Sequence, residues 1–150
     1  MAGDIVVRGE YNDIFEFSYS NVVKITVGLY IPCELAVDRK LICDSSGLIK
    51  EALSDVTCRE VKLDKVELMD FKIYLNWLYT DILGTKYARM QEEFKLLAEL
   101  YFLGLKIKDV RFQNNIITAM VDKSQEHLYE DLPGIECIKL AYEGYHDTSA

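Results

Sequence analysis

The stretch VVKITVGLYIPCELAV, residues 22–37, decides the fold of this chain. Five of the six residues from Val22 to Val27 are β-branched, and the run alternates well enough for a strand. Gly28 closes this run, and Pro32 precedes a second apolar run, Cys33-Glu34-Leu35-Ala36-Val37. The pattern therefore predicts two paired strands joined by a short turn.

Downstream of these strands the apolar spacing changes to that of helices. From Arg39 it predicts two short helices joined by Ser45-Ser46, where a serine caps the start of the second helix. A short alternating strand, Glu60 to Leu63, follows. Asp64 and Glu67 have the spacing of a capping box, which predicts that the next helix starts there.

Three longer amphipathic helices are predicted next, at residues 67–79, 91–105 and 109–121. The last of them carries its apolar positions at Val110, Ile117, Met120 and Val121. A polar break at 122–131 separates it from a final helix that begins near Pro133. Three consecutive helices with short links favour a small helical cluster.

Before residue 22, short strands at 4–8 and 14–17 are predicted on either side of turn-forming residues. Strands first and helices afterwards indicate an α+β domain, a small β-sheet covered by a cluster of α-helices. No parallel βαβ unit is evident in the sequence.

Length and charge limit the function classes. The chain has 150 residues, enough for one domain with a sizeable core, and 50% of them are hydrophobic. Its 25 acidic and 17 basic residues give a net charge of -8, which argues against nucleic acid and against a membrane surface as partner. The N-terminus lacks the pattern of an export signal, so an intracellular protein, cytoplasmic or nuclear, is expected.

The cysteines and histidines define the alternative to an interaction domain. Four scattered cysteines, without a C-x-x-C pair, predict neither a zinc site nor a redox motif, and they favour a reduced compartment. A cysteine that reacts with the help of His127 or His146 would make the chain a small thiol enzyme. Small buried thiols are the simpler interpretation.

Other groups with chemical potential have structural explanations. Glu92-Glu93 fit a solvated first turn of a helix, and the aromatic stripe at helical spacing fits a core or an interface. That stripe consists of Tyr74, Trp77, Tyr79, Tyr101 and Phe102. We find no glycine-rich phosphate loop. The sequence thus predicts no catalytic residue, no metal site and no cofactor, which leaves a protein-interaction domain.

The order of several short runs resembles a BTB/POZ domain, in particular the fungal type. The runs are residues 19–28, YSNVVKITVG; 35–46, LAVDRKLICDSS; 61–64, VKLD; 76–80, NWLYT; 97–101, LAELY; 109–117, DVRFQNNII; and 138–143, IKLAYE. The similarity extends from Tyr19 to about Tyr145. It implies an N-terminal segment at 1–18 that could serve as a dimerisation arm, a BTB/POZ-like domain at 19–123, and a C-terminal helical extension with a frayed tail at 124–150.

Three positions depart from the family pattern. Asp38 stands where the family has histidine, Asn21 where it has an acidic residue, and Asp81 where it has glycine. Some transcription-repressor members pair that acidic residue with a basic one in a partner pocket, so Asn21 and Arg39 are the corresponding pocket residues here.

The resemblance also implies partners. Family members commonly form homodimers, and many bind a cullin N-terminal domain as ubiquitin-ligase adaptors through a hydrophobic-x-Glu motif. The matching stretch is Leu53-Ser54-Asp55, for which a helix end with Leu53 in the core is the structural alternative.

The expected dimer seam lies in the N-terminal strands, because an apolar strand without a partner in its own chain needs a second molecule to cover it. The seam residues are Ile5, Val6, Val7 and Phe15. A dimerising transcriptional regulator that acts through a partner is the second interaction hypothesis.

Overall fold

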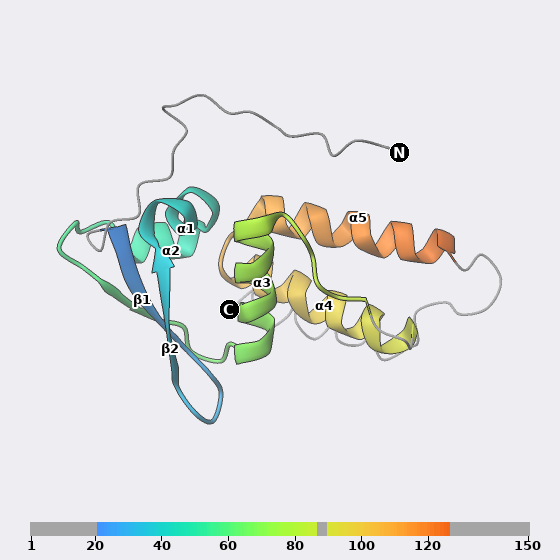
Figure 1. The fold of residues 1–150 in the computed structure, drawn as a ribbon, viewed down its shortest axis with the longest axis horizontal. Helices are drawn as coiled ribbons and strands as arrows, with labels where there is room; N and C mark the ends of the chain where they lie inside the picture. The colour runs from blue at the N-terminus through green and yellow to red at the C-terminus, as the bar shows by residue number, and fades with distance from the viewer. Residues whose placement is uncertain (1–20, 87–89, 127–150) are drawn as a thin grey trace, which may run out of the picture.

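The structure is a computed structural model that describes residues 21–86 and 90–126. The small sheet and two short helices lie on one side, and the three longer helices lie on the other (Figure 1). In chain order the elements are β1 (Val22–Val27), β2 (Cys33–Asp38), α1 (Arg39–Ser45), α2 (Gly47–Ala52), β3 (Glu60–Lys62), α3 (Leu68–Thr80), α4 (Met90–Lys106) and α5 (Val110–Glu126). The α+β prediction is confirmed. The predicted strands at 4–8 and 14–17 and the helix from Pro133 lie outside the described residues.

The sheet has three strands in the order β2-β1-β3. β1 and β2 form the predicted pair, which is antiparallel, with Val22 opposite Asp38 and Val27 opposite Cys33. Gly28, with φ of +129°, makes the turn between them, where the carbonyl oxygen of Ile31 would lie 2.2 Å from an added Cβ. β3 pairs with β1 in parallel, which the sequence did not lead us to expect, because three residues are too few to reveal strand direction.

Two capped short helices follow β2, as predicted. The Asp38 side chain accepts from the backbone N–H of Leu41 at the start of α1 (2.7 Å). Ser46 separates the helices, and its Oγ accepts from the backbone N–H of Ile49 (3.2 Å) while donating to the carbonyl of Ile107 (2.7 Å). One serine therefore caps α2 and ties it to the end of α4.

The capping box predicted for α3 is wrong. Asp64 lies in a turn with Lys65, whose φ is 56°, and the helix begins only at Leu68. Glu67 is the N-cap residue and makes no side-chain capping bond. Asp64 and Lys65 form the turn after β3, so they cannot belong to the first turn of the helix as the capping box requires.

Helices α4 and α5 lie side by side beyond α3, and two predictions about them need correction (Figure 1). α5 continues to Glu126, and it buries Phe112 and Ile116 while Val110, Ile117 and Val121 stay exposed. Glu93 is buried rather than solvated. Its carboxylate lies 2.5 Å from the Nζ of Lys123 in α5 and accepts from the Thr85 hydroxyl (3.3 Å).

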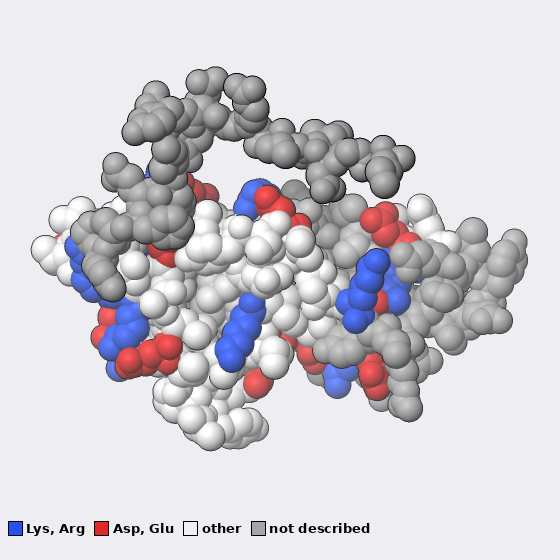
Figure 2. Space-filling model, in the orientation of Figure 1, with Lys and Arg blue, Asp and Glu red and all other residues white. Residues whose placement is uncertain are grey.

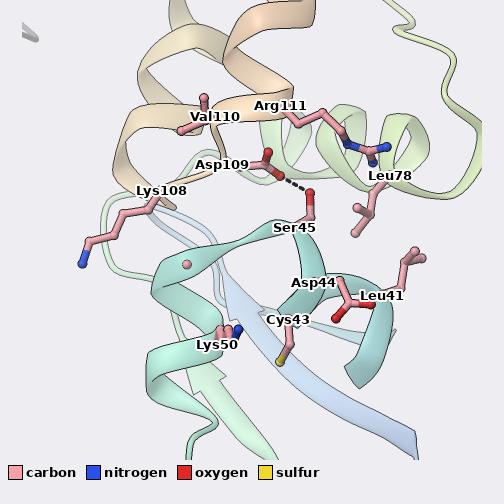
Figure 3. A pocket seen from close by; sticks show the side chains of 11 residues that line it. Leu41, Cys43, Asp44, Ser45, Lys50, Leu78, Lys108, Asp109, Val110 and Arg111 are labelled. Carbon is pink, nitrogen blue, oxygen red and sulfur yellow. Dashed lines mark hydrogen bonds between the residues drawn. The ribbon is translucent and has the colours of Figure 1, made fainter.

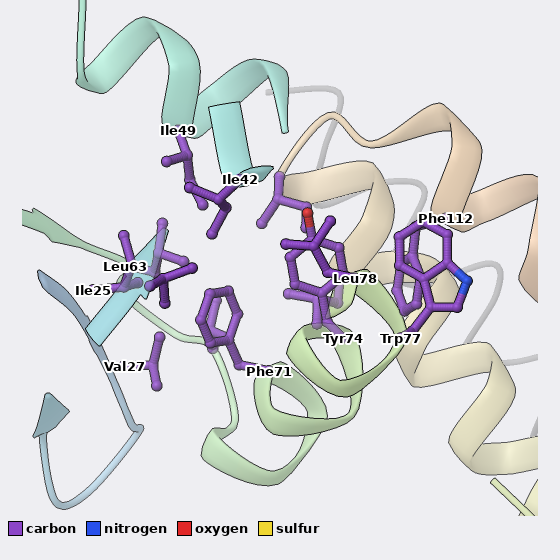
Figure 4. Close-up of a cluster of buried hydrophobic side chains, with 14 of the residues drawn as sticks. Ile25, Val27, Ile42, Ile49, Leu63, Phe71, Tyr74, Trp77, Leu78 and Phe112 are labelled. Carbon is purple, nitrogen blue, oxygen red and sulfur yellow. The ribbon is translucent and has the colours of Figure 1, made fainter. Parts of the chain in front are cut away.

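The core has an aliphatic part and an aromatic part (Figure 4). Ile25 of β1, Ile42 of α1 and Ile49 of α2 meet Phe71 of α3, all fully buried. Further along α3, Tyr74 and Trp77 pack on Phe112 with ring centroids 4.9 and 4.8 Å apart. The remaining stripe residues, Tyr79, Tyr101 and Phe102, are partly exposed. Among the described helices none is long and apolar enough to cross a membrane.

Candidate functional site

Arg39, the first residue of α1, fastens the loop between α2 and β3. Its Nη2 donates to the carbonyls of Leu53 (2.6 Å) and Asp55 (3.0 Å), and its Nη1 to those of Cys58 (2.8 Å) and Val56 (3.4 Å). The planar fork of a guanidinium suits such multiple acceptors, whereas a lysine ammonium has no comparable geometry. We call residues 53–58 with their Arg39 contacts the clamped loop.

The three residues predicted to contact a cullin lie in this clamped loop, in different environments. Leu53 ends α2 and is only 4% exposed, whereas Ser54 and Asp55 are exposed in the turn that follows. The structure thus has the arrangement of the structural alternative, with Leu53 in the core. Its side chain cannot reach a partner without leaving that core.

The Asp55 carboxylate is engaged within the loop. Its Oδ1 accepts from the backbone N–H (2.8 Å) and the hydroxyl (2.7 Å) of Thr57, which closes an Asx turn. These hydrogen bonds lower the pKa of Asp55, since they favour the ionised form. Asp55 is therefore an anion whose first role is to shape its own loop.

The predicted pocket residues Asn21 and Arg39 are both half-buried. Asn21 immediately precedes β1, and Arg39 follows β2, which pairs with β1. The Arg39 guanidinium points to the clamped loop, where it donates to the four carbonyls named above. Asp38, at the position of the family histidine, caps α1 with its side chain, and its backbone N–H donates to the hydroxyl oxygen of Tyr79 (2.9 Å).

A cavity of about 670 Å³ lies between α1, α2 and the turn that joins α4 to α5 (Figure 3). Its charged wall residues are largely paired with neighbours. Asp44 is bound by Lys40 (2.7 Å), Lys108 by Glu51 (3.1 Å) and Arg111 by Asp81 (3.6 Å). The Arg111 guanidinium also lies over the Trp77 ring at 4.5 Å. The wall carries both signs of charge and favours no ion of one sign.

At the base of this cavity Asp109 is a fully buried carboxylate. Its Oδ2 accepts from the hydroxyls of Ser45 and Tyr74, the latter at 2.9 Å, and its Oδ1 from the backbone N–H of Phe112 (2.9 Å). Burial and the neighbouring Asp109 charge raise the pKa of Tyr74. Ser45 is therefore one of three donors that the buried Asp109 carboxylate holds in place.

The described cysteines, Cys33, Cys43 and Cys58, are free and half-buried. Burial raises the pKa of the Cys43 thiol, which reduces the thiolate available for attack. Cys137, His127 and His146 lie outside the described residues. Within the described part of the chain no cluster of His, Cys, Asp and Glu could hold a metal ion.

Acidic and basic side chains are interspersed on the face shown in Figure 2. A nucleic-acid site would need a continuous basic area there. On this face the described residues form no such area, in line with the net charge of -8.

Sequence reasoning missed Asp109 and the role of Arg39. The aspartate starts a predicted helix, so a cap was foreseeable, but its bonds to Ser45 and Tyr74 join residues that are far apart along the chain. The Arg39 contacts are likewise tertiary. Comparison with family models and with curated proteins found no match for this chain.

Proposed function

We propose that this chain is a non-enzymatic protein–protein interaction domain of the BTB/POZ type. One observation carries the proposal: the runs that resemble the family meet in one core. The β1–β2 pair contains residues 22–27 and 35–38, and β3, with residues 61–62, lies beside β1. Trp77 of α3 packs on Phe112 of α5. These contacts join runs that lie far apart along the chain, as a shared domain fold requires.

The proposed assembly is a homodimer or a hetero-oligomer. Its seam is formed by Ile5, Val6, Val7 and Phe15, which lie outside the described residues. The three-stranded sheet has β2 and β3 at its edges, and apolar strands from a second molecule are a common cover for such edges. The proposal places the protein inside the cell, in the cytoplasm or the nucleus.

The dimer is tested by the double variant Val6→Asp and Phe15→Asp. Two buried charges without partners oppose association, so a folded monomer near 17.3 kDa is expected in sedimentation velocity. Circular dichroism checks that the variant keeps the parent's fold. A variant with the molar mass of the parent dimer would contradict the proposed seam.

The more specific form of the proposal is a cullin-binding ubiquitin-ligase adaptor. The clamped loop supports it, because it offers exposed Ser54 and the ionised Asp55 next to one another on a fixed turn. A substrate would be captured by another segment or by a partner. A dimer that binds no cullin would favour the regulator hypothesis instead.

A further inference from the structure

The outer edge of β2 is open among the described residues. β2 is an edge strand of the sheet, with β1 on one side and no described strand on the other. The backbone N–H of Lys24 in β1 donates to the carbonyl of Arg59 (2.8 Å), so Lys24 faces β3 and its β2 partner, Ala36, faces the open edge. Glu34, two residues earlier in β2, faces the same way. The N–H and carbonyl groups of Glu34 and Ala36 therefore point away from β1.

This open stretch ends at matched positions. At one end Pro32 has no backbone N–H to offer. At the other end the backbone N–H of Asp38 already donates to the Tyr79 hydroxyl (2.9 Å). Pro32 and Asp38 are each three residues from Leu35, so the open stretch is centred on Leu35. An edge with this symmetry can pair antiparallel with an identical edge about a two-fold axis.

We propose that β2 pairs antiparallel with β2 of a second copy of this chain, with the two-fold axis at Leu35. In this register Glu34 of each copy lies opposite Ala36 of the other. Each of these two pairs exchanges two backbone N–H to carbonyl hydrogen bonds. The two three-stranded sheets thereby become one continuous sheet.

The side chains favour this register over its neighbours. Leu35 is half-buried against the core, and at the axis it meets its own copy as a directly opposed apolar pair. On the other face an exposed glutamate meets an exposed alanine. Moving the pairing by one step in either direction would put Glu34 opposite Glu34 or Asp38 of the second copy. Like charges directly opposite each other destabilise a sheet.

Exposed apolar residues at the two ends of β2 also match. Tyr30 and Ile31 lie in the turn that joins β1 to β2, which projects from the sheet, and they are 93% and 80% exposed (Figure 1). In the proposed register this turn reaches the end of β2 in the second copy. There Tyr79, which is 51% exposed, binds the outer side of Asp38. The pairing therefore covers apolar side chains at both ends.

This contact is separate from the proposed N-terminal seam, because it uses β2 alone. One strand edge is small beside the roughly 1,200 Å² that a stable interface buries, so we expect weak association that grows with protein concentration. A dimer held by the N-terminal seam carries two open β2 edges. Edge pairing then links such dimers into chains at high concentration.

The register is tested by changing the charge at Ala36 in the double variant that removes the N-terminal seam. Sedimentation equilibrium of the full chain between about 10 μM and about 1 mM gives the association constant. Ala36→Glu puts a like charge opposite Glu34 twice, so the constant should fall by about fivefold, and Ala36→Lys should raise it by about fivefold. Inside its own sheet Ala36 lies opposite Lys24, so an effect on the fold alone would have the opposite sign.

The matched controls are Ala52→Glu and Ala52→Lys. Ala52 is an exposed alanine at the end of α2, outside the β2 edge, and these variants carry the same net charges as the Ala36 variants. They should change the association constant by less than about twofold, because salt screens charges that are not in contact. Thermal unfolding checks that every variant is folded.

The axis is tested by Leu35→Cys in a Cys33→Ser background. Directly opposed residues of a non-hydrogen-bonded pair have Cα atoms about 4.5 Å apart, which a disulfide can span. Oxidised glutathione should therefore link two chains, and mass spectrometry should find the residue-35 peptide joined to itself. Glu34→Cys in the same background is the control, since residue 34 faces residue 36 of the second copy and should link at least about fivefold less.

Equal association of Ala36→Glu and Ala36→Lys, or no link at residue 35, would overturn the pairing of β2 edges. A link that forms only in the absence of the N-terminal seam would show that the N-terminal strands cover β2 in the parent, and would overturn it as well. The proposed seam is judged apart from this pairing, because it concerns the molar mass at low concentration, where the edges do not associate.

Discussion

Asp70 is a carboxyl group whose protonation affects stability. It is half-buried in the first turn of α3. Burial, and then the charges of Glu99 and Glu67, raise its pKa from 3.8 to about 6. The folded state therefore binds more protons than the unfolded state between these values, and stability falls as the pH rises from about 4 to about 6.

Asp70→Asn should abolish this dependence. We expect the variant to be more stable than the parent at pH 7 by about 1 kcal/mol, less than the full shift because the group is partly solvated. Near pH 3.5 the two proteins should be about equally stable. Urea unfolding at both pH values measures the difference, and a variant less stable than the parent at pH 7 would contradict the raised pKa.

Individual residues were predictable where the cause is local. Ser46 caps a helix because its hydroxyl reaches an N–H three residues away, and the sequence pattern contains that spacing. Glu93 was placed in water because its partner Lys123 belongs to another helix. Arg39 was assigned to a pocket through the family resemblance. Its bonds to the loop beyond α2 had no signal in the sequence, since they join residues far apart along the chain.

Among the elements, α1, α3 and α5 are joined by the carboxylate of Asp109. It caps α5 and accepts from Ser45 of α1 and Tyr74 of α3, so three helices converge on one buried anion. Asp109→Asn should lower the free energy of unfolding by about 2–3 kcal/mol. The reason is that the asparagine amide has an N–H donor on the side where the Ser45 and Tyr74 hydroxyls also donate. Urea unfolding of the variant gives the value.

Tyr74→Phe is the control for this network. It removes one donor, while the Asp109 carboxylate still accepts from Ser45 and from the backbone N–H of Phe112. We therefore expect a smaller decrease in the free energy of unfolding, about 1 kcal/mol. An Asp109→Asn variant as stable as the parent would show that the three helices are held by apolar packing alone.

Within the described residues, most helix and strand positions followed from periodicity, whereas the buried faces and the contacts between elements did not. The three long helices begin within about one residue of their predicted starts, because apolar spacing marks where a helix can bury one side. In α5, Phe112 and Ile116 are buried in the core, while Val110 and Val121 stay exposed. Apolar residues surround much of this helix, so its buried face is decided by packing on α3 and α4. The direction of β3 depends on the path through α1 and α2, which carries no local signature.

At the scale of the whole molecule, element order was enough for the α+β class, and composition was enough for the net charge of -8. They do not determine the partner, because an interface is formed by residues that a fold happens to bring together. Leu53, Ser54 and Asp55 illustrate this: a motif contiguous in sequence is divided between core and surface by the end of α2.

Sedimentation velocity of the purified chain, alone and mixed with a cullin N-terminal domain, tests the interaction-domain account most directly. Alone, the account predicts a species of about twice 17.3 kDa, as expected for a homodimer. In the mixture it predicts a faster boundary that contains both proteins. A 17.3 kDa monomer that sediments unchanged beside the cullin domain would contradict the account.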